Sequence, residues 1–291
     1  MIPKTLFKRP HGDLMGKNSK IEWTNHTFNP WWGCTKVSAA CKHCYAESWS
    51  KRVGQNVWGP KASRRFFGDS HWSEPIKWNK EAVTSRQRRR VFCASMADVF
   101  EDRRELDAWR TKLWTLIDET PQLDWLLLTK RPELVGELVP WGNKWPKNVW
   151  LGTTVEDQES ADTRLQHLAR WPATIRFISA EPLLGPIDIQ QWLGSTIDWV
   201  ITGGESGPKA RPSSPSWFRE LMGQCMAAEV PFHFKQWGDW APGQGVNLPA
   251  ERKRRESEAD DGTIMLRLGK KAAGRLLDGT TWDGIPKVKM A

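Results

Sequence analysis

The chain has 291 residues, of which 39% are hydrophobic and 26% are charged, a composition typical of a folded globular protein. It has no secretory h-region and no apolar run of about 18 residues, which excludes a membrane-spanning helix and predicts a cytoplasmic protein with reduced thiols. The net charge of +9 indicates attraction to polyanions, of which nucleic acid is the commonest.

Short apolar runs recur along the chain, rich in β-branched residues, leucine or aromatic residues, as in buried parallel strands. The predicted strands are residues 23–28, 91–95, 125–129, 149–154, 175–179, 199–202 and 231–234. Helices are predicted between them over residues 41–53, 106–120, 132–138, 160–169 and 216–229. Strands that alternate with helices indicate βαβ units, whose right-handed connections curl a parallel sheet towards a barrel or partial barrel.

The composition divides the chain into three parts. Residues 1–20 form a loose basic arm, residues 21–237 the predicted barrel, and residues 238–291 a loop and C-terminal extension that packs on the barrel. The extension begins with a Gly/Pro-rich and then highly charged stretch over residues 238–262, which we expect to be a loop. A short amphipathic helix is predicted within residues 269–279, between flanking glycines.

Basic residues gather in three further runs, at residues 61–65, 86–90 and 252–255. Each run alone would be an ordinary solvated surface, but together with the net charge the runs favour contacts with phosphates. Trp58 and Trp72 lie in predicted loops, where an exposed indole ring would stack on a base.

Polar segments follow five of the predicted strands, at residues 95–98, 129–131, 153–156, 179–181 and 202–205. In parallel α/β folds the carboxyl ends of the strands carry the site, so we expect these segments to meet at one rim. Lys130 and Arg131 suit a carboxylate or phosphate there, although a solvated loop pair is the plainer interpretation. Glu156 and Glu181 are either substrate ligands or helix-capping acids, and Gly203-Gly204 either permits close approach of a ligand or makes a turn.

Three cysteines, Cys34, Cys41 and Cys44, lie within eleven residues, between the first predicted strand and a predicted helix. Three thiolates would hold three irons of a [4Fe–4S] cluster and leave the fourth open to a small molecule. The alternative is a zinc site, with His43 or a remote residue as the fourth ligand. The remaining cysteines, Cys93 and Cys225, are far apart in the sequence, so no second cysteine pair supports zinc.

The cysteine segment resembles the radical S-adenosylmethionine superfamily, which carries three cysteines after its first strand. This chain departs from the common pattern of that superfamily, because its first gap is six residues and His43 stands in place of an aromatic residue. The surrounding stretch is similar to a phage-associated branch, and so are Thr129-Lys-Arg-Pro, Glu181-Pro-Leu-Leu-Gly, Thr202-Gly-Gly-Glu-Ser and the segment 269–279. The likeness covers most of residues 20–285.

The resemblance implies a partial (β/α)6 TIM-like barrel that holds a [4Fe–4S] cluster on Cys34, Cys41 and Cys44. It further implies reductive cleavage of S-adenosylmethionine to a radical that abstracts hydrogen, with a small electron donor such as flavodoxin or ferredoxin. The residues implied in binding S-adenosylmethionine and nearby groups are Ser95, Asp98, Thr154, Glu156, Glu181, Gly203 and Gly204. The catalytic residues implied are Cys93, Lys130 and Glu205, with a buried structural role as the alternative for Cys93.

The phage-type resemblance implies a modified nucleotide as substrate, and our best prediction is isomerisation of a glycyl thymidine in phage DNA during base hypermodification in the host cytoplasm. Lys130 or Arg131 would bind the glycyl carboxylate. A DNA-lesion repair lyase is an alternative that requires Cys93 or Cys225 as a hydrogen donor. A zinc-stabilised nucleic-acid-binding protein without catalysis is the alternative of a different class.

Overall fold

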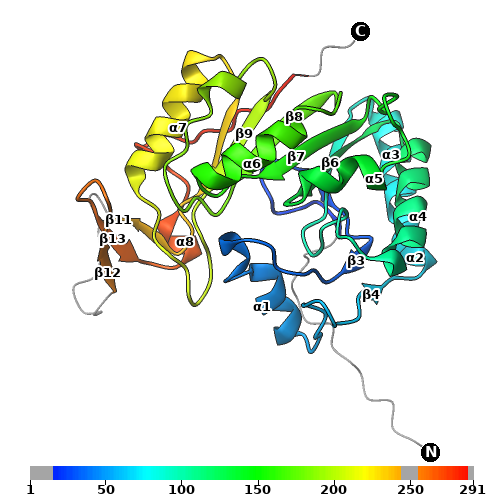
Figure 1. Ribbon diagram of the computed structural model, residues 1–291, viewed down its shortest axis with the longest axis horizontal. Helices are drawn as coiled ribbons and strands as arrows, with labels where there is room; N and C mark the ends of the chain where they lie inside the picture. Colours follow the sequence, from blue (N-terminus) through cyan, green and yellow to red (C-terminus); the bar gives the residue numbers. More distant parts are fainter. Residues whose placement is uncertain (1–15, 244–254, 288–291) are drawn as a thin grey trace, which may run out of the picture.

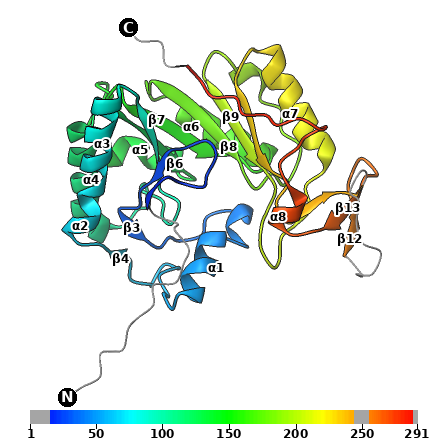
Figure 2. The same ribbon diagram turned by 180° about the vertical axis from the view of Figure 1, so that it is seen from behind.

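A curled sheet of eight strands lies at the centre of the computed structural model, which describes residues 16–243 and 255–287 (Figures 1 and 2). In spatial order the strands are β1 (Gly16–Lys17), β2 (His26–Thr27), β5 (Arg89–Cys93), β6 (Leu123–Thr129), β7 (Val149–Thr154), β8 (Ile175–Ala180), β9 (Trp199–Gly203) and β10 (Phe232–Gln236). β1 is antiparallel to β2, and the other seven strands pair in parallel. The predicted α/β class is therefore confirmed, as a seven-strand half-barrel compatible with a TIM-like fold.

Helices cover the outer, convex face of the sheet (Figures 1 and 2). They are α3 (Glu74–Ser85), α4 (Asp107–Glu119), α5 (Val135–Leu138), α6 (Gln158–Leu168) and α7 (Pro215–Ala227), with the short α2 (Asp69–Trp72) before α3. α6 begins with a capping box, in which the Asp157 carboxylate accepts from the Ser160 N–H. α3 was not predicted, although Pro75, Trp78 and Ala82 are buried along one face of it.

Large aromatic side chains fill the inner, concave face of the sheet. Trp199 packs edge-on against Trp23 and Trp150, and Phe177 lies beside it. Gly152 leaves room for this layer, because a Cβ atom there would lie 2.4 Å from the Phe177 ring. The inner face is therefore a packed core at the amino end of the strands, and it forms a floor beneath their carboxyl ends.

The segment that holds the three cysteines crosses the open side of the half-barrel. It runs from β3 (Trp31–Trp32), which pairs with β4 (Arg65–Phe66), into α1 (Tyr45–Arg52). An isolated bridge between Gly33 and Ala97 ties the segment to the loop after β5. The first three cysteines are thereby held against the carboxyl ends of the strands.

The C-terminal extension contains more regular structure than the sequence predicted. The stretch 238–262 was expected to be a loop, but β11 (Trp240–Pro242), β12 (Glu256–Glu258) and β13 (Ile264–Arg267) form an antiparallel sheet. The helix expected within residues 269–279 is limited to α8 (Lys270–Ala273). α8 lies across the open side from α1 in both views (Figures 1 and 2). Residues 1–15 of the predicted basic arm and residues 252–254 of the last basic run lie outside the described residues.

The segment after α8 returns to the edge of the central sheet, beside β10. The N–H of Phe234 donates to the Trp282 carbonyl at 2.9 Å, and the N–H of Gly284 donates to the Phe232 carbonyl at 2.9 Å. A Cβ atom at position 284 would lie 2.6 Å from that carbonyl oxygen, so only glycine allows this approach. The outer edge of β10 is thus covered by the same chain.

Two expectations about nucleic-acid contacts are corrected by the packing. Trp72 was expected in an exposed loop, but it is buried in α2 against Phe28 and Trp109. Arg64, within a basic run predicted to contact phosphates, is buried and paired with a carboxylate of the same chain. Among residues 16–243 and 255–287, no helix has the length and apolarity needed to cross a membrane.

Candidate functional site

A cavity of about 440 Å³ opens at the carboxyl ends of the parallel strands. This volume falls in the range of about 300–1,000 Å³ that is common for small-molecule sites. We call it the rim cavity, and its lining residues include Cys34, Cys41, Cys44, Ser95, Asp98, Lys130, Arg131, Thr154, Glu181, Gly204, Glu205, Lys235 and Lys270. Trp23 and Phe92 form part of its apolar floor. The rim segments that follow the strands therefore do meet at one site.

The cysteine loop, residues 34–44, brings three half-buried free thiols to this cavity. The loop starts at Gly33, whose φ of +116° is a conformation that favours glycine. A Cβ atom at this position would lie 2.3 Å from the Val57 carbonyl oxygen and 2.6 Å from Cδ of Arg64. The glycine before the first cysteine is therefore required by both backbone conformation and packing.

The donor set of the loop suits a metal group bound by thiolates, although a coordination shell is not formed within the described residues. No three His, Cys, Asp or Glu side chains there are close enough to hold a metal ion. Burial, together with nearby Asp98, raises the pKa of Cys34 to about 12, and burial also raises the pKa of Cys44. Burial therefore favours the protonated thiol at Cys34 and Cys44, and a bound metal would reverse this because it favours thiolate.

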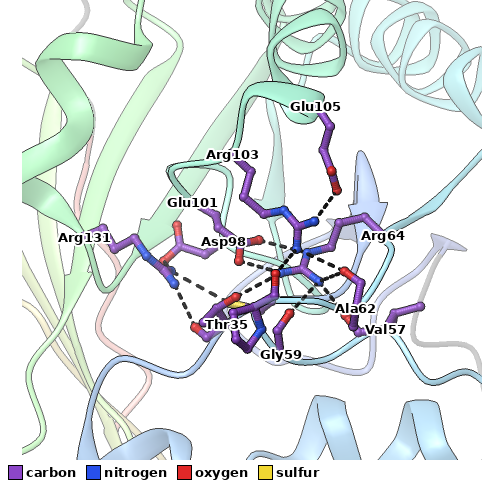
Figure 3. A network of polar contacts seen from close by, with 12 residues as sticks. Thr35, Val57, Gly59, Ala62, Arg64, Asp98, Glu101, Arg103, Glu105 and Arg131 are labelled. Atoms are coloured by element: carbon purple, nitrogen blue, oxygen red, sulfur yellow. Dashed lines mark hydrogen bonds and ion pairs between the residues drawn. The ribbon is translucent and has the colours of Figure 1, made fainter.

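Arg131 contacts the first of these thiols, that of Cys34, and Figure 3 shows its guanidinium beside Thr35 and Asp98. Its Nη1 lies 3.8 Å from Cys34 Sγ and donates to Asp98 Oδ2 at 2.9 Å, while its Nη2 donates to the Thr35 carbonyl at 2.7 Å. Asp98 also accepts from the Thr129 hydroxyl at 2.8 Å. Asp98 was predicted to bind S-adenosylmethionine, but here its carboxylate holds Arg131.

A second arginine fixes the back of the cysteine loop (Figure 3). Arg64 donates to both carboxylate oxygens of Glu101, at 3.0 and 2.6 Å, and to the Thr35 hydroxyl at 3.0 Å. It also donates to the carbonyls of Val57 and Gly59. One buried guanidinium thus joins the cysteine loop, the segment before β4 and the loop after β5.

Two acidic residues of the rim are already paired within the protein. Glu205 accepts from Arg211 at 2.6 and 2.9 Å and lies 3.3 Å from Nδ1 of His43. Burial alone would raise its pKa, but these hydrogen bonds lower it, so Glu205 is a carboxylate. Glu181 accepts from Lys235 Nζ at 2.8 and 2.9 Å. Both carboxylates line the rim cavity, as the sequence predicted.

Lys130 differs from Arg131 and Lys235 among the cations of the cavity wall. Its Nζ donates to the Thr154 hydroxyl at 2.9 Å, and no carboxylate contacts it among the described residues. Arg131 and Lys235, in contrast, each pair with a carboxylate. Lys130 is therefore better suited than Arg131 or Lys235 to bind an external anion, and it lies at a strand end, directly after β6.

Three predicted site residues do not line the rim cavity. Cys93 is fully buried in β5 and packs in the core between the sheet and the helices, where burial raises its pKa. Its neighbours Phe92 and Ala94 face the cavity instead, because alternate residues of a strand point to opposite faces. Glu156 forms a buried ion pair with Arg164. Gly203 lies in β9, in the wall behind Glu181.

Two residues that were not predicted also support the site. Tyr45 donates its hydroxyl to the Ser95 carbonyl at 2.9 Å. The Asn29 side chain donates to the Ser95 hydroxyl at 3.1 Å and accepts from the Met96 N–H at 2.7 Å. Both residues flank the cysteines in the segment that resembles the superfamily, and that position was the available signal.

A family model described as "Protein of unknown function (DUF5131)" matches residues 18–286, so the chain belongs to this family. No curated protein and no solved structure matches the chain.

Proposed function

We propose that this DUF5131 member is a radical S-adenosylmethionine enzyme, with a [4Fe–4S] cluster on Cys34, Cys41 and Cys44. One observation carries the proposal: three thiols of a single loop line a cavity at the carboxyl edge of a curled parallel sheet. This is the edge at which α/β folds place their sites. The number of thiols leaves one iron of a cubane cluster without a protein ligand.

When bound, the cluster and S-adenosylmethionine together supply a 5′-deoxyadenosyl radical that abstracts hydrogen from a C–H bond. The protein's own residues bind and orient the reactants. Ser95 is held in place by Asn29, and Glu181 presents a carboxylate suited to the amino group of S-adenosylmethionine. Gly204 permits close approach of a ligand, and the Trp23 and Phe92 floor excludes water from the reacting atoms.

For the substrate, we propose a modified nucleotide whose anionic group binds Lys130. The ammonium of Lys130 lines the cavity without a carboxylate partner in the described part of the chain, and the net charge of +9 suits a DNA substrate. Glycyl thymidine in phage DNA, isomerised through a radical on its glycyl group, is the specific substrate that we propose to test. The burial of Cys93 and Cys225 in the outer core gives no support to the repair-lyase alternative.

Anaerobic purification followed by iron and zinc analysis tests the enzyme class. We expect a brown protein with about four irons per chain that releases 5′-deoxyadenosine when given dithionite and S-adenosylmethionine. Alanine at Cys34, Cys41 or Cys44 should abolish both properties, whereas C225A, which changes a thiol buried in α7, should retain them. A colourless protein that binds one zinc after attempted cluster reconstitution would refute the proposal and favour the zinc-stabilised nucleic-acid-binding alternative.

The substrate is tested separately with an oligonucleotide that carries glycyl thymidine. Conversion of the base within the oligonucleotide, detected by mass spectrometry after digestion, is the expected result. Activity on the free nucleoside alone would contradict the proposed DNA substrate. A C93A variant should remain active, because its side chain faces away from the cavity.

A further inference from the structure

We propose that Arg131 is a positioning residue that donates a charge-assisted hydrogen bond to the Cys34 sulfur and thereby tunes the cluster. The inference rests on the proposed function, because it concerns the electronic properties of a cluster bound by this cysteine. The contact with Arg131 would distinguish Cys34 from Cys41 and Cys44, because its sulfur accepts a hydrogen bond from a cationic side chain.

Arg131 is held by groups on both sides of the guanidinium. Its side chain is 7% exposed and that of Asp98 is 8% exposed, so the ion pair is shielded from water. Asp98 is fixed in turn by the Thr129 hydroxyl and by the Lys130 N–H, at 2.8 and 3.0 Å. With one donor on Asp98 and another on the Thr35 carbonyl, the guanidinium has little freedom to turn away from Cys34.

The three sulfurs have different neighbours. Cys34 Sγ faces the Arg131 cation at 3.8 Å, whereas Cys41 Sγ lies 3.7 Å from the neutral Ser38 hydroxyl. Cys44, which precedes α1, is approached by the backbone N–H groups of Ala46 and Glu47, and the Lys130 cation acts on it through charge alone. The close cationic donor is therefore placed on the first cysteine of the loop.

Hydrogen bonds to the sulfurs and the local charge are two factors that set the reduction potential of an iron–sulfur cluster. A cation beside one thiolate stabilises the reduced cluster, which carries one more negative charge. It also strengthens the hold on the metal, because partners outside the coordination shell orient the ligands. Arg131 should therefore raise the midpoint potential and slow the loss of iron.

A merely structural role would give a different result. If Arg131 only neutralised Asp98, a lysine would replace it with little effect on the cluster. Lysine keeps the charge but lacks the planar fork that allows one side chain to reach Asp98, Thr35 and Cys34 together. Arg131→Lys therefore separates the two roles.

The test compares reconstituted wild type, R131K and R131Q with R88K as a matched control. Arg88 also pairs with a buried carboxylate, Asp124, but at the amino end of β6, away from the cavity. Iron per chain, the rate of iron loss to a chelator, and the midpoint potential in a dithionite titration followed by electron paramagnetic resonance are measured. R131K and R131Q should have lower potentials and lose iron about 10- to 100-fold faster, and R88K should match the wild type.

Wild-type potential and iron retention in R131K would overturn the role of Arg131, even if R131Q fails to fold. A wild-type protein that assembles no iron–sulfur cluster would instead refute the proposed function, and this inference with it. The two failures are distinguishable, because the first requires a normal wild-type cluster and the second its absence.

Discussion

Replacing Arg64 by methionine should destabilise the protein strongly, because it breaks a buried ion pair. The Arg64 side chain has no exposed area and that of Glu101 is 3% exposed. Both oxygens of Glu101 accept hydrogen bonds from Arg64, so the variant leaves this carboxylate buried and unpaired. Removing one partner of such a pair costs about 3–5 kcal/mol, a large part of the roughly 5–15 kcal/mol by which a typical protein is stable.

Urea unfolding followed by tryptophan fluorescence measures this loss. With a slope of about 3 kcal/mol per M, the upper end for small proteins, the midpoint should fall by about 1–1.7 M. The double variant R64M/E101Q removes both charges and should be more stable than R64M. Because Arg64 also holds Thr35, R64M should bind less iron than the wild type after reconstitution.

The control is R219M, which breaks the Arg219–Asp278 pair on the surface. The side chains of this pair are 46% and 45% exposed, and such pairs contribute about 0–1 kcal/mol. If R64M lowers the urea midpoint no more than R219M does, the buried Arg64–Glu101 pair does not stabilise the protein.

Three further predictions concern the cavity wall and the sheet. G204A should lower the free energy of unfolding in urea by about 1–3 kcal/mol, because its Cβ would lie 2.0 Å from the Trp237 carbonyl oxygen. The control G223A adds a Cβ at an open position in α7 and should not lower the free energy of unfolding in this way. Burial lowers the pKa of His233 from 6.5 to about 4, so the unfolded chain binds more protons between these values and stability should fall as the pH drops from 6.5 towards 4. The same urea midpoints, measured in H233Q, should lose this part of the pH dependence. K130M should raise the Kd for a glycyl thymidine oligonucleotide about 10- to 100-fold, because a charged hydrogen bond is lost. The iron content should stay unchanged. An unchanged Kd would show that Lys130 does not bind the substrate.

The sequence predicted the strands best where apolar runs are continuous. β7 has the predicted bounds, residues 149–154, and all its residues are buried. The first predicted strand, residues 23–28, shortens to two residues in β2, because the polar Thr24 and Asn25 bind the backbone of Arg90 from outside the ladder. α3 was missed although Pro75, Trp78 and Ala82 recur at the spacing of one helix face and are buried. The signal was therefore present in the sequence and was overlooked among the surrounding charged residues.

The position of the candidate site could be predicted from the sequence, but the contacts between its side chains could not. Polar residues at strand ends, such as Ser95 and Glu181, reached the expected rim because parallel strands end on one side. The contact of Arg131 with Cys34 spans 97 positions in the sequence. A sequence shows that a charge is present, but the folded chain determines which partner it meets.

The covered edges of the sheet have a consequence for association between chains. An open parallel sheet has two edge strands whose free N–H and C=O groups can recruit another chain. Here β1 pairs antiparallel with β2 at one side, and residues 282–284 bond to β10 at the other. The half-barrel can therefore keep its rim cavity open without offering β2 or β10 as a template for strand addition and aggregation.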